Sequence, residues 1–199
     1  MKSTLTNMVI VLLAITAIAS ASVGGVYMLT KEPIAIANEN AKKAALAEVL
    51  PAFEQTTMTE ITLDELPLEV YTATAADGSV VGYAVNTATM KGFSGLFRLM
   101  VGITADGVVN NVNVLSHNET PGLGSKMADA DNPLLGSVKS KNIKEINWAM
   151  SKNGGDIDAL TAATISSVAY ADAMQRAMAA YEQVANNEAE GQKGECCNE

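Results

Sequence analysis

The sequence contains few of the residues that hold metal ions and iron–sulfur clusters. It has one histidine and two cysteines, and the cysteines are adjacent, at Cys196 and Cys197. Structural zinc sites and iron–sulfur clusters are built from sets of cysteine and histidine ligands at characteristic spacings, which are absent here. No metal centre is therefore expected, and a redox role would require an organic cofactor.

Basic residues are also scarce. The chain of 199 residues has 13 Lys and Arg against 22 Asp and Glu, which gives a formal net charge of −9 and a pI near 4.6. A nucleic-acid partner is not expected, because phosphate contacts depend on Lys and Arg. The length is sufficient for one domain and a membrane anchor.

One long stretch near the N-terminus lacks charge altogether. The run from Met8 to Leu29 spans roughly 22 residues, enough for one helix to cross a bilayer. Lys2 and the free amino terminus precede the run, and their positive charge weakly favours a cytoplasmic N-terminus, whereas Lys31 just after the run counts against this orientation. A cleaved signal peptide is the alternative, because Ala19-Ser20-Ala21 has a small-x-small pattern. We expect a retained single-pass anchor over residues 1–32 in the cytoplasmic (inner) membrane, with the rest of the chain on its outer side.

The remaining chain predicts an α+β domain over residues 33–186 and a flexible polar tail over 187–199. A helix is expected from Ile34 to Leu50, ended by Pro51, followed by a polar loop over 54–66. Two β-hairpins are expected next, each centred on an Asp-Gly pair. Their strands are 70–74 with 80–87 and 96–103 with 108–116, so we expect an antiparallel sheet with flanking helices.

A hydroxyl-rich stretch, Asp158 to Ser167, precedes apolar residues with helical spacing at Val168, Ala171, Met174, Met178 and Tyr181. This pattern places Thr161 and Thr164 where a loop becomes a helix. The unpaired N–H groups at a helix start attract phosphate, so a threonine there could carry a phosphate ester. A plain hydroxyl N-cap is the alternative interpretation.

Two glycine-containing segments lie upstream, at Lys91 to Gly95 and at Ser116 to Gly124. Each is compatible with a simple turn. The second is not a phosphate-binding loop, because the Gly-x-x-x-x-Gly-Lys-Ser/Thr spacing is absent. It is not a hydrolase site either, because Ser116 and His117 are neighbours at a strand end and point to opposite faces.

These segments together resemble the FMN-binding domain family. That family has an Asp-x-x-Ser/Thr-Gly-Ala-Thr/Ser motif, which Asp158, Thr161, Ala163 and Thr164 match, and a His-x-Glu-Thr-Pro-Gly-Leu-Gly motif, which is intact from His117 to Gly124. The glycine of the first motif is Ala162 here, which would be strained if that position needs a positive φ. A Gly-aromatic-x-Gly element is matched by Gly92, Phe93 and Gly95.

The resemblance implies that a flavin transferase attaches FMN to Thr164 through a phosphodiester bond. It also implies that the glycine-rich loop packs against the flavin ring. Lys126, just after this loop, is a candidate positive neighbour of the flavin, and a solvated residue at a helix start is the alternative interpretation. The residues expected to bind the cofactor are Asp158, Thr161, Ala163, Thr164, Ile165, Glu119, Thr120, Pro121, Gly122, Leu123, Gly124, Lys126, Gly92 and Gly95.

The function that the resemblance implies is electron relay. The expected setting is a membrane-bound, ion-translocating ferredoxin:NAD oxidoreductase of the Rnf type, whose other subunits would be the partners. One alternative is the C subunit of the sodium-translocating NADH:quinone reductase, which shares both motifs. Another is a membrane-anchored adaptor of the same fold that binds no flavin, an alternative favoured only by Ala162.

Overall fold

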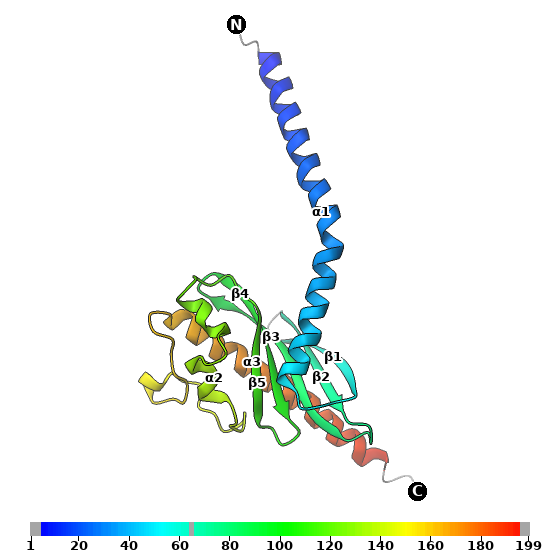
Figure 1. Ribbon diagram of the computed structural model, residues 1–199, viewed down its shortest axis with the longest axis vertical. Coiled ribbons are helices and arrows are strands. Elements are labelled where there is room, and N and C mark those ends of the chain that lie inside the picture. The colour runs from blue at the N-terminus through cyan, green and yellow to red at the C-terminus, as the bar shows by residue number, and fades with distance from the viewer. Residues whose placement is uncertain (1–4, 64–65, 196–199) are drawn as a thin grey trace. The chain divides into compact units, whose positions relative to one another are not determined.

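A computed structural model describes residues 5–63 and 66–195, with side chains described as far as residue 187. The chain divides into two compact units, Met1–Lys42 and Lys43–Glu199. The sheet and the helices that surround the candidate site all lie in the second unit, shown in Figure 1.

The first unit consists of most of helix α1, Leu5–Val49. Its most apolar 18-residue stretch has a mean hydropathy of 2.3 and no buried residue, so α1 is long and apolar enough to cross a membrane. The helix passes through Pro33 without ending there, so the helix expected from Ile34 is the continuation of the apolar helix. The end of the transmembrane anchor at residue 32 was predicted from composition and stays a prediction.

The second unit is built on a five-stranded antiparallel sheet with the order β1-β2-β3-β4-β5. Each strand pairs with the next along the chain, which confirms the α+β class and both expected hairpins. The strands are β1 (Gln55–Leu63), β2 (Leu66–Thr74), β3 (Val80–Gly92), β4 (Gly95–Thr104) and β5 (Val109–Ser116).

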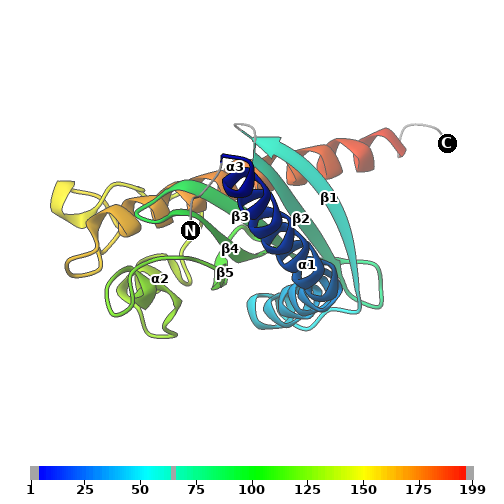
Figure 2. The same cartoon turned by 90° about the horizontal axis from the view of Figure 1, so that it is seen from above.

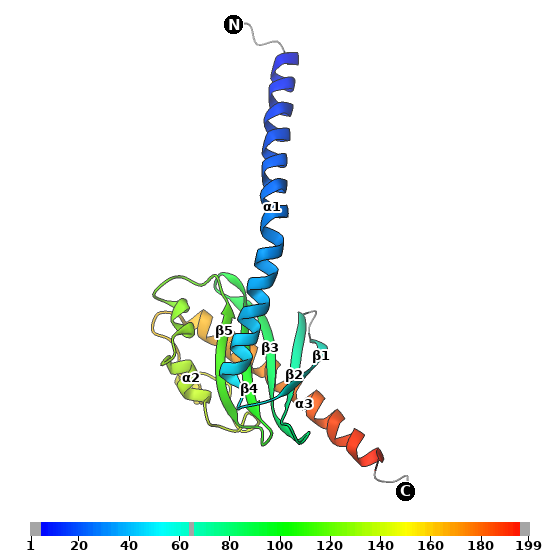
Figure 3. The same cartoon turned by 45° about the vertical axis from the view of Figure 1, so that its right-hand side comes forward.

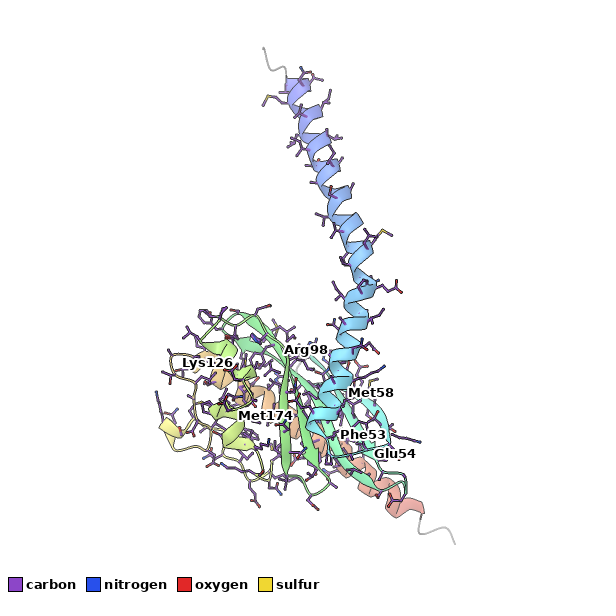
Figure 4. The ribbon with its side chains drawn as sticks, viewed as in Figure 1. Phe53, Glu54, Met58, Arg98, Lys126 and Met174 are labelled. Atoms are coloured by element: carbon purple, nitrogen blue, oxygen red, sulfur yellow. The ribbon has the colours of Figure 1, made fainter. Side chains whose placement is uncertain are left out.

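The expected loop over 54–66 was wrong, because most of it is the edge strand β1. This strand reads Gln-Thr-Thr-Met-Thr-Glu-Ile-Thr-Leu, and none of its nine positions is fully buried. Met58 on β1 (labelled in Figure 4) is 55% exposed. Only Ile61 and Leu63, at the end of β1, pack against the core, so apolar alternation is confined to the last three residues and the rest of the strand is exposed. Apart from this short stretch, only the threonine and isoleucine content favoured a strand.

Helix α3, Thr164–Glu195, packs on one face of the sheet (Figure 2). Tyr170 and Met174 on α3 are fully buried with Phe97 and Leu99 of β4. The helix continues to Glu195, past residue 187, where a flexible tail was expected. Cys196 and Cys197 lie outside the described residues.

The last turn of α1, which belongs to the second unit, packs on the opposite face of the sheet. Leu46 and Val49 contact a small apolar cluster that includes Ala84 and Met100. The Asn110 side chain donates a hydrogen bond to the Val49 carbonyl at 2.7 Å. The sheet is therefore covered on both faces at its centre.

Three short helices follow β5. They lie on the side of β5 that faces away from β4 (Figure 3). They are η1 (Gly124–Ala128), α2 (Pro133–Val138) and η2 (Ser151–Asn153). Asn132 caps α2, because its side chain accepts a hydrogen bond from the Leu135 N–H at 2.8 Å. The candidate site lies where this region meets the start of α3.

Asp172 fixes the beginning of α3 to the end of β3. Its carboxylate accepts hydrogen bonds from Thr89 at 2.7 Å, Lys91 at 2.6 Å and Arg176 at 3.2 Å. Burial favours the neutral form, but these three donors outweigh it and lower the pKa of Asp172 below its usual value. The helix start and the turn that follows β3 are thereby held by one charged cluster.

Candidate functional site

Three segments that are distant in sequence surround a cavity of about 350 Å³ at the N-terminal end of α3. One is the turn between β3 and β4, another is the loop after β5, and the third is the junction that leads into α3. The residues that line the cavity are Phe93, Glu119, Thr120, Leu123, Gly124, Ala162, Ala163, Thr164, Ile165 and Ser166. Its size is that of a small-molecule pocket.

The turn between β3 and β4 presents an aromatic ring to the solvent. Gly92 pairs with Gly95 across the hairpin, and Gly95 has a φ of +91°. A positive φ is readily adopted by glycine and strained in most other residues, which explains the glycine at this turn. Phe93 is 64% exposed although it lines the cavity, so its ring is available to cover a ligand.

The loop after β5 is held by hydrogen bonds among its own residues. The Leu123 N–H donates to the Thr120 carbonyl at 3.2 Å, and the Gly122 N–H donates to the Ser125 hydroxyl at 2.9 Å. Gly122 has a φ of +76°, so its glycine is required by backbone conformation. A Cβ at Gly122 would meet no atom within 4 Å, which places this residue at the open side of the loop.

The four hydroxyl groups of the Thr161–Ser167 stretch have different environments. Ser166 and Ser167 are buried, and each donates a hydrogen bond, to Glu119 at 2.7 Å and to the Ala163 carbonyl at 2.9 Å respectively. Ser167 also accepts the Leu160 N–H at 2.9 Å.

Thr161 and Thr164 are exposed, and neither hydroxyl has a hydrogen-bond partner among the described residues. Only Thr164 lines the cavity. It is also the first residue of α3, as the sequence predicted, and the N–H groups of its turn have no partners within the helix.

Ala162, at the position of the family glycine, has a φ of +60°. The left-handed conformation costs a non-glycine residue about 1–2 kcal/mol. The strain anticipated from the sequence is therefore present, and Ala162 also lines the cavity.

We expect Ala162→Gly to raise the free energy of unfolding by about 0.5–1 kcal/mol, since relief of strain exceeds the added chain entropy of glycine. Urea denaturation of the full chain would measure this difference. Ala159→Gly is the matched control in the same loop, where φ is not positive, and it should lower stability instead. Equal losses in both variants would contradict a strained Ala162.

The expected binding residues fall into two groups. Seven of them line the cavity: Glu119, Thr120, Leu123, Gly124, Ala163, Thr164 and Ile165. The other seven are not among its lining residues: Gly92, Gly95, Pro121, Gly122, Lys126, Asp158 and Thr161. Whether any of them binds a cofactor stays a prediction.

Of the second group, Asp158 is hydrogen-bonded to another element and Lys126 has an exposed side chain. The Asp158 N–H donates to the Ser137 hydroxyl of α2 at 2.9 Å, and its side chain is exposed. Lys126 lies on η1 with an exposed side chain (Figure 4).

Phe93, Ala162 and Ser166 line the cavity but were not among the residues expected to bind the cofactor, although Phe93 lies in one of the matched family elements. Ser166 could have been found from its place two residues after Thr164 in the first turn of α3. Over the described parts of the chain, no group of three or more His, Cys, Asp or Glu could hold a metal ion.

Comparison with known proteins gives consistent matches over most of the chain. The FMN-binding domain family matches residues 92–179, which include all three cavity segments. The G subunit of the ion-translocating oxidoreductase complex of Methanosarcina acetivorans is 31% identical over 179 residues, covering 87% of this chain and 93% of the relative. The corresponding G subunit of Aliivibrio fischeri strain MJ11 is 30% identical, covering 86% and 87%.

Two further matches are the G subunit of another complex and a solved structure. The G subunit of the Na(+)-translocating ferredoxin:NAD(+) oxidoreductase complex of Acetobacterium woodii is 32% identical over 144 residues, covering 70% of this chain and 69% of the relative. The crystal structure of Shewanella oneidensis NqrC matches with a TM-score of 0.45 and 20% identity, covering 64% of this chain and 65% of that one.

Proposed function

The chain belongs to the FMN-binding domain family, together with the G subunits of ion-translocating oxidoreductase complexes, and on this premise we propose that it relays electrons through FMN attached to Thr164. The attachment would be a phosphodiester bond formed by a flavin transferase. The observation that carries the proposal is the position of Thr164: an exposed hydroxyl at the first residue of a helix, on the lining of a cavity.

The residues of the cavity fit a flavin mononucleotide. The first turn of α3 offers unpaired N–H groups and the positive end of the helix dipole, both of which favour a phosphate. The side chains of Phe93, Leu123 and Ile165 are apolar and partly exposed, as suits contact with a flat aromatic ring. Gly124 lets the backbone form one wall without a side chain.

FMN supplies the capacity to accept and donate electrons, and the protein supplies position and environment. In this proposal Thr164 anchors the phosphate end, while Phe93, Leu123 and Ile165 exclude water from the ring. The high exposure of Phe93 leaves the cofactor close to the surface, where a redox partner could approach.

We place this function in a membrane complex of the Rnf type, because the relatives are named as subunits of ion-translocating oxidoreductase complexes. The other subunits of such a complex would supply and receive the electrons. Helix α1 would anchor the chain in the cytoplasmic membrane, with the N-terminus inside and the domain outside, where covalent attachment prevents loss of the flavin.

A flavin-free adaptor is the second candidate, and one observation favours it. Ala162 replaces the family glycine at a position with positive φ, so the motif that a flavin transferase would recognise is altered and strained.

The presence of flavin distinguishes the two candidates. The full chain would be produced with and without a flavin transferase, purified, and scanned for flavin absorbance and for in-gel fluorescence after denaturation. We expect denaturation-resistant fluorescence only when the transferase is present. A colourless protein in the presence of an active transferase would contradict the proposal and support the adaptor.

A further inference from the structure

Glu119 is a charged residue in an unusual position. Its side chain is only 5% exposed, although Asn118 and Thr120 on either side are exposed. A carboxylate is costly to bury unless hydrogen bonds replace its water. The burial of Glu119 therefore needs an explanation beyond the conformation of its loop.

The carboxylate of Glu119 joins both of the other cavity segments. Oε1 accepts the backbone N–H of Ser94, in the turn between β3 and β4, at 3.2 Å. Oε2 accepts the hydroxyl of Ser166, in the first turn of α3, at 2.7 Å. The Glu119 N–H itself donates to His117 Nδ1 at 3.2 Å, which orients the residue within its own loop.

Two glycines make room for this side chain. A Cβ on Gly92 would overlap the backbone carbonyl oxygen of Gly95 and lie 2.7 Å from Glu119 Oε1. A Cβ on Gly124 would lie 2.8 Å from Oε2 and 2.5 Å from the Ser166 hydroxyl oxygen. Real Cβ atoms do not approach other heavy atoms so closely. The absence of a side chain at Gly124 is therefore explained by the space that Glu119 and Ser166 occupy, and at Gly92 by the Gly95 carbonyl together with the carboxylate.

We propose that Glu119 is a positioning residue of the cavity. Its carboxylate connects the loop after β5 to the turn that carries Phe93 and to the start of α3 that carries Thr164. It sets the distance between these walls without itself serving as the attachment point. The role of Glu119 in placing the flavin ring rests on the proposed function. The bridge that its hydrogen bonds form between the three segments does not.

The bridge formed by these two hydrogen bonds needs polar atoms in the right positions more than it needs a negative charge. Two variants of Glu119 should therefore behave differently. In Glu119→Gln, the amide oxygen can accept from Ser94 and the amide NH₂ can donate to the Ser166 hydroxyl, which both donates and accepts. In Glu119→Ala, both connections are lost and the Ser94 N–H and the Ser166 hydroxyl lose their partner. Glutamine should therefore rescue what alanine disrupts.

The first test uses the full chain without flavin, by hydrogen exchange of backbone amides. We expect Glu119→Ala to speed exchange at least about tenfold over 92–97 and over 160–167, because the hydrogen bonds from Ser94 and Ser166 to the Glu119 side chain are lost. Exchange in the centre of β4, over 99–103, should not change, and Glu119→Gln should resemble the wild type. A folded alanine variant with wild-type exchange, or a glutamine variant as fast as alanine, would overturn the proposal.

Ser166→Ala tests the same bridge if the alanine variant at 119 does not fold. It removes only the connection to α3, so exchange should rise over 160–167 and stay near wild type over 92–97. A rise confined to 92–97 would contradict the assignment of the two carboxylate oxygens.

The second test uses the flavin-loaded chain and measures the absorbance maximum and midpoint potential of the bound flavin. Both should shift in Glu119→Ala and remain near wild type in Glu119→Gln. Unchanged values in the alanine variant would overturn the role in ring placement. If the wild type carries no flavin while the exchange results hold, the proposed function fails and the bridge stands.

Discussion

Replacing Thr164 with alanine is expected to remove covalently bound FMN completely while leaving the domain folded. The hydroxyl is the proposed ester position, and alanine offers no oxygen there. The cost to the free energy of unfolding should be about 0.5 kcal/mol or less, since the side chain is exposed and has no hydrogen-bond partner among the described residues. In-gel flavin fluorescence under denaturing conditions, after expression with a flavin transferase, gives the result directly.

Thr161→Ala is the matched control for this prediction. Thr161 belongs to the same motif and is equally exposed, but it does not line the cavity. Its replacement should preserve the attached flavin. Persistent fluorescence in Thr164→Ala together with its loss in Thr161→Ala would move the attachment site to Thr161.

Gly102→Ala is expected to lower the free energy of unfolding by about 3 kcal/mol, at the upper end of the usual cost of overpacking. A Cβ on Gly102 of β4 would lie 1.9 Å from the carbonyl oxygen of Val49 and 2.6 Å from its carbonyl carbon. The same oxygen accepts a hydrogen bond from the Asn110 side chain. The last turn of α1 would therefore have to leave the sheet.

Urea denaturation of the detergent-solubilised full chain would measure this loss. Gly136→Ala on α2 is the control, because a Cβ there meets nothing within 4 Å and alanine favours a helix by about 1 kcal/mol over glycine. Gly136→Ala should be neutral or stabilising. A wild-type midpoint for Gly102→Ala would show that the end of α1 does not pack against β4 as described.

The sheet was predictable where its signals are local. The Asp77-Gly78 and Asp106-Gly107 pairs identified two hairpins, and both occur in the structure. Strand β1 could not be found in this way, because most of its residues are exposed and polar and its apolar alternation is confined to Ile61 and Leu63. The continuity of α1 through Pro33 was also not evident, since a proline normally signals the end of a helix.

The site was predictable as a set of motifs but not as an arrangement. The sequence placed Thr164 at a helix start, and α3 begins at that residue. It also predicted strain at Ala162 if that position needs a positive φ, and the φ of Ala162 is positive. It could not show that Ser166 is buried and bonded while Thr164 is exposed, because solvent exposure depends on tertiary packing. The bridge from Glu119 to Ser94 and Ser166 joins residues 25 and 47 positions apart, for which no local pattern exists.

Mass spectrometry of the flavin-loaded protein tests the central claim most directly. Trypsin cleavage after Lys152 and Arg176 releases one peptide, Asn153 to Arg176, that contains both exposed threonines and both buried serines of the motif. The account predicts that this peptide carries the added mass of one FMN phosphodiester, and that fragmentation places it on Thr164. An unmodified peptide from protein that still contains flavin, or a modification on Thr161, Ser166 or Ser167, would contradict it.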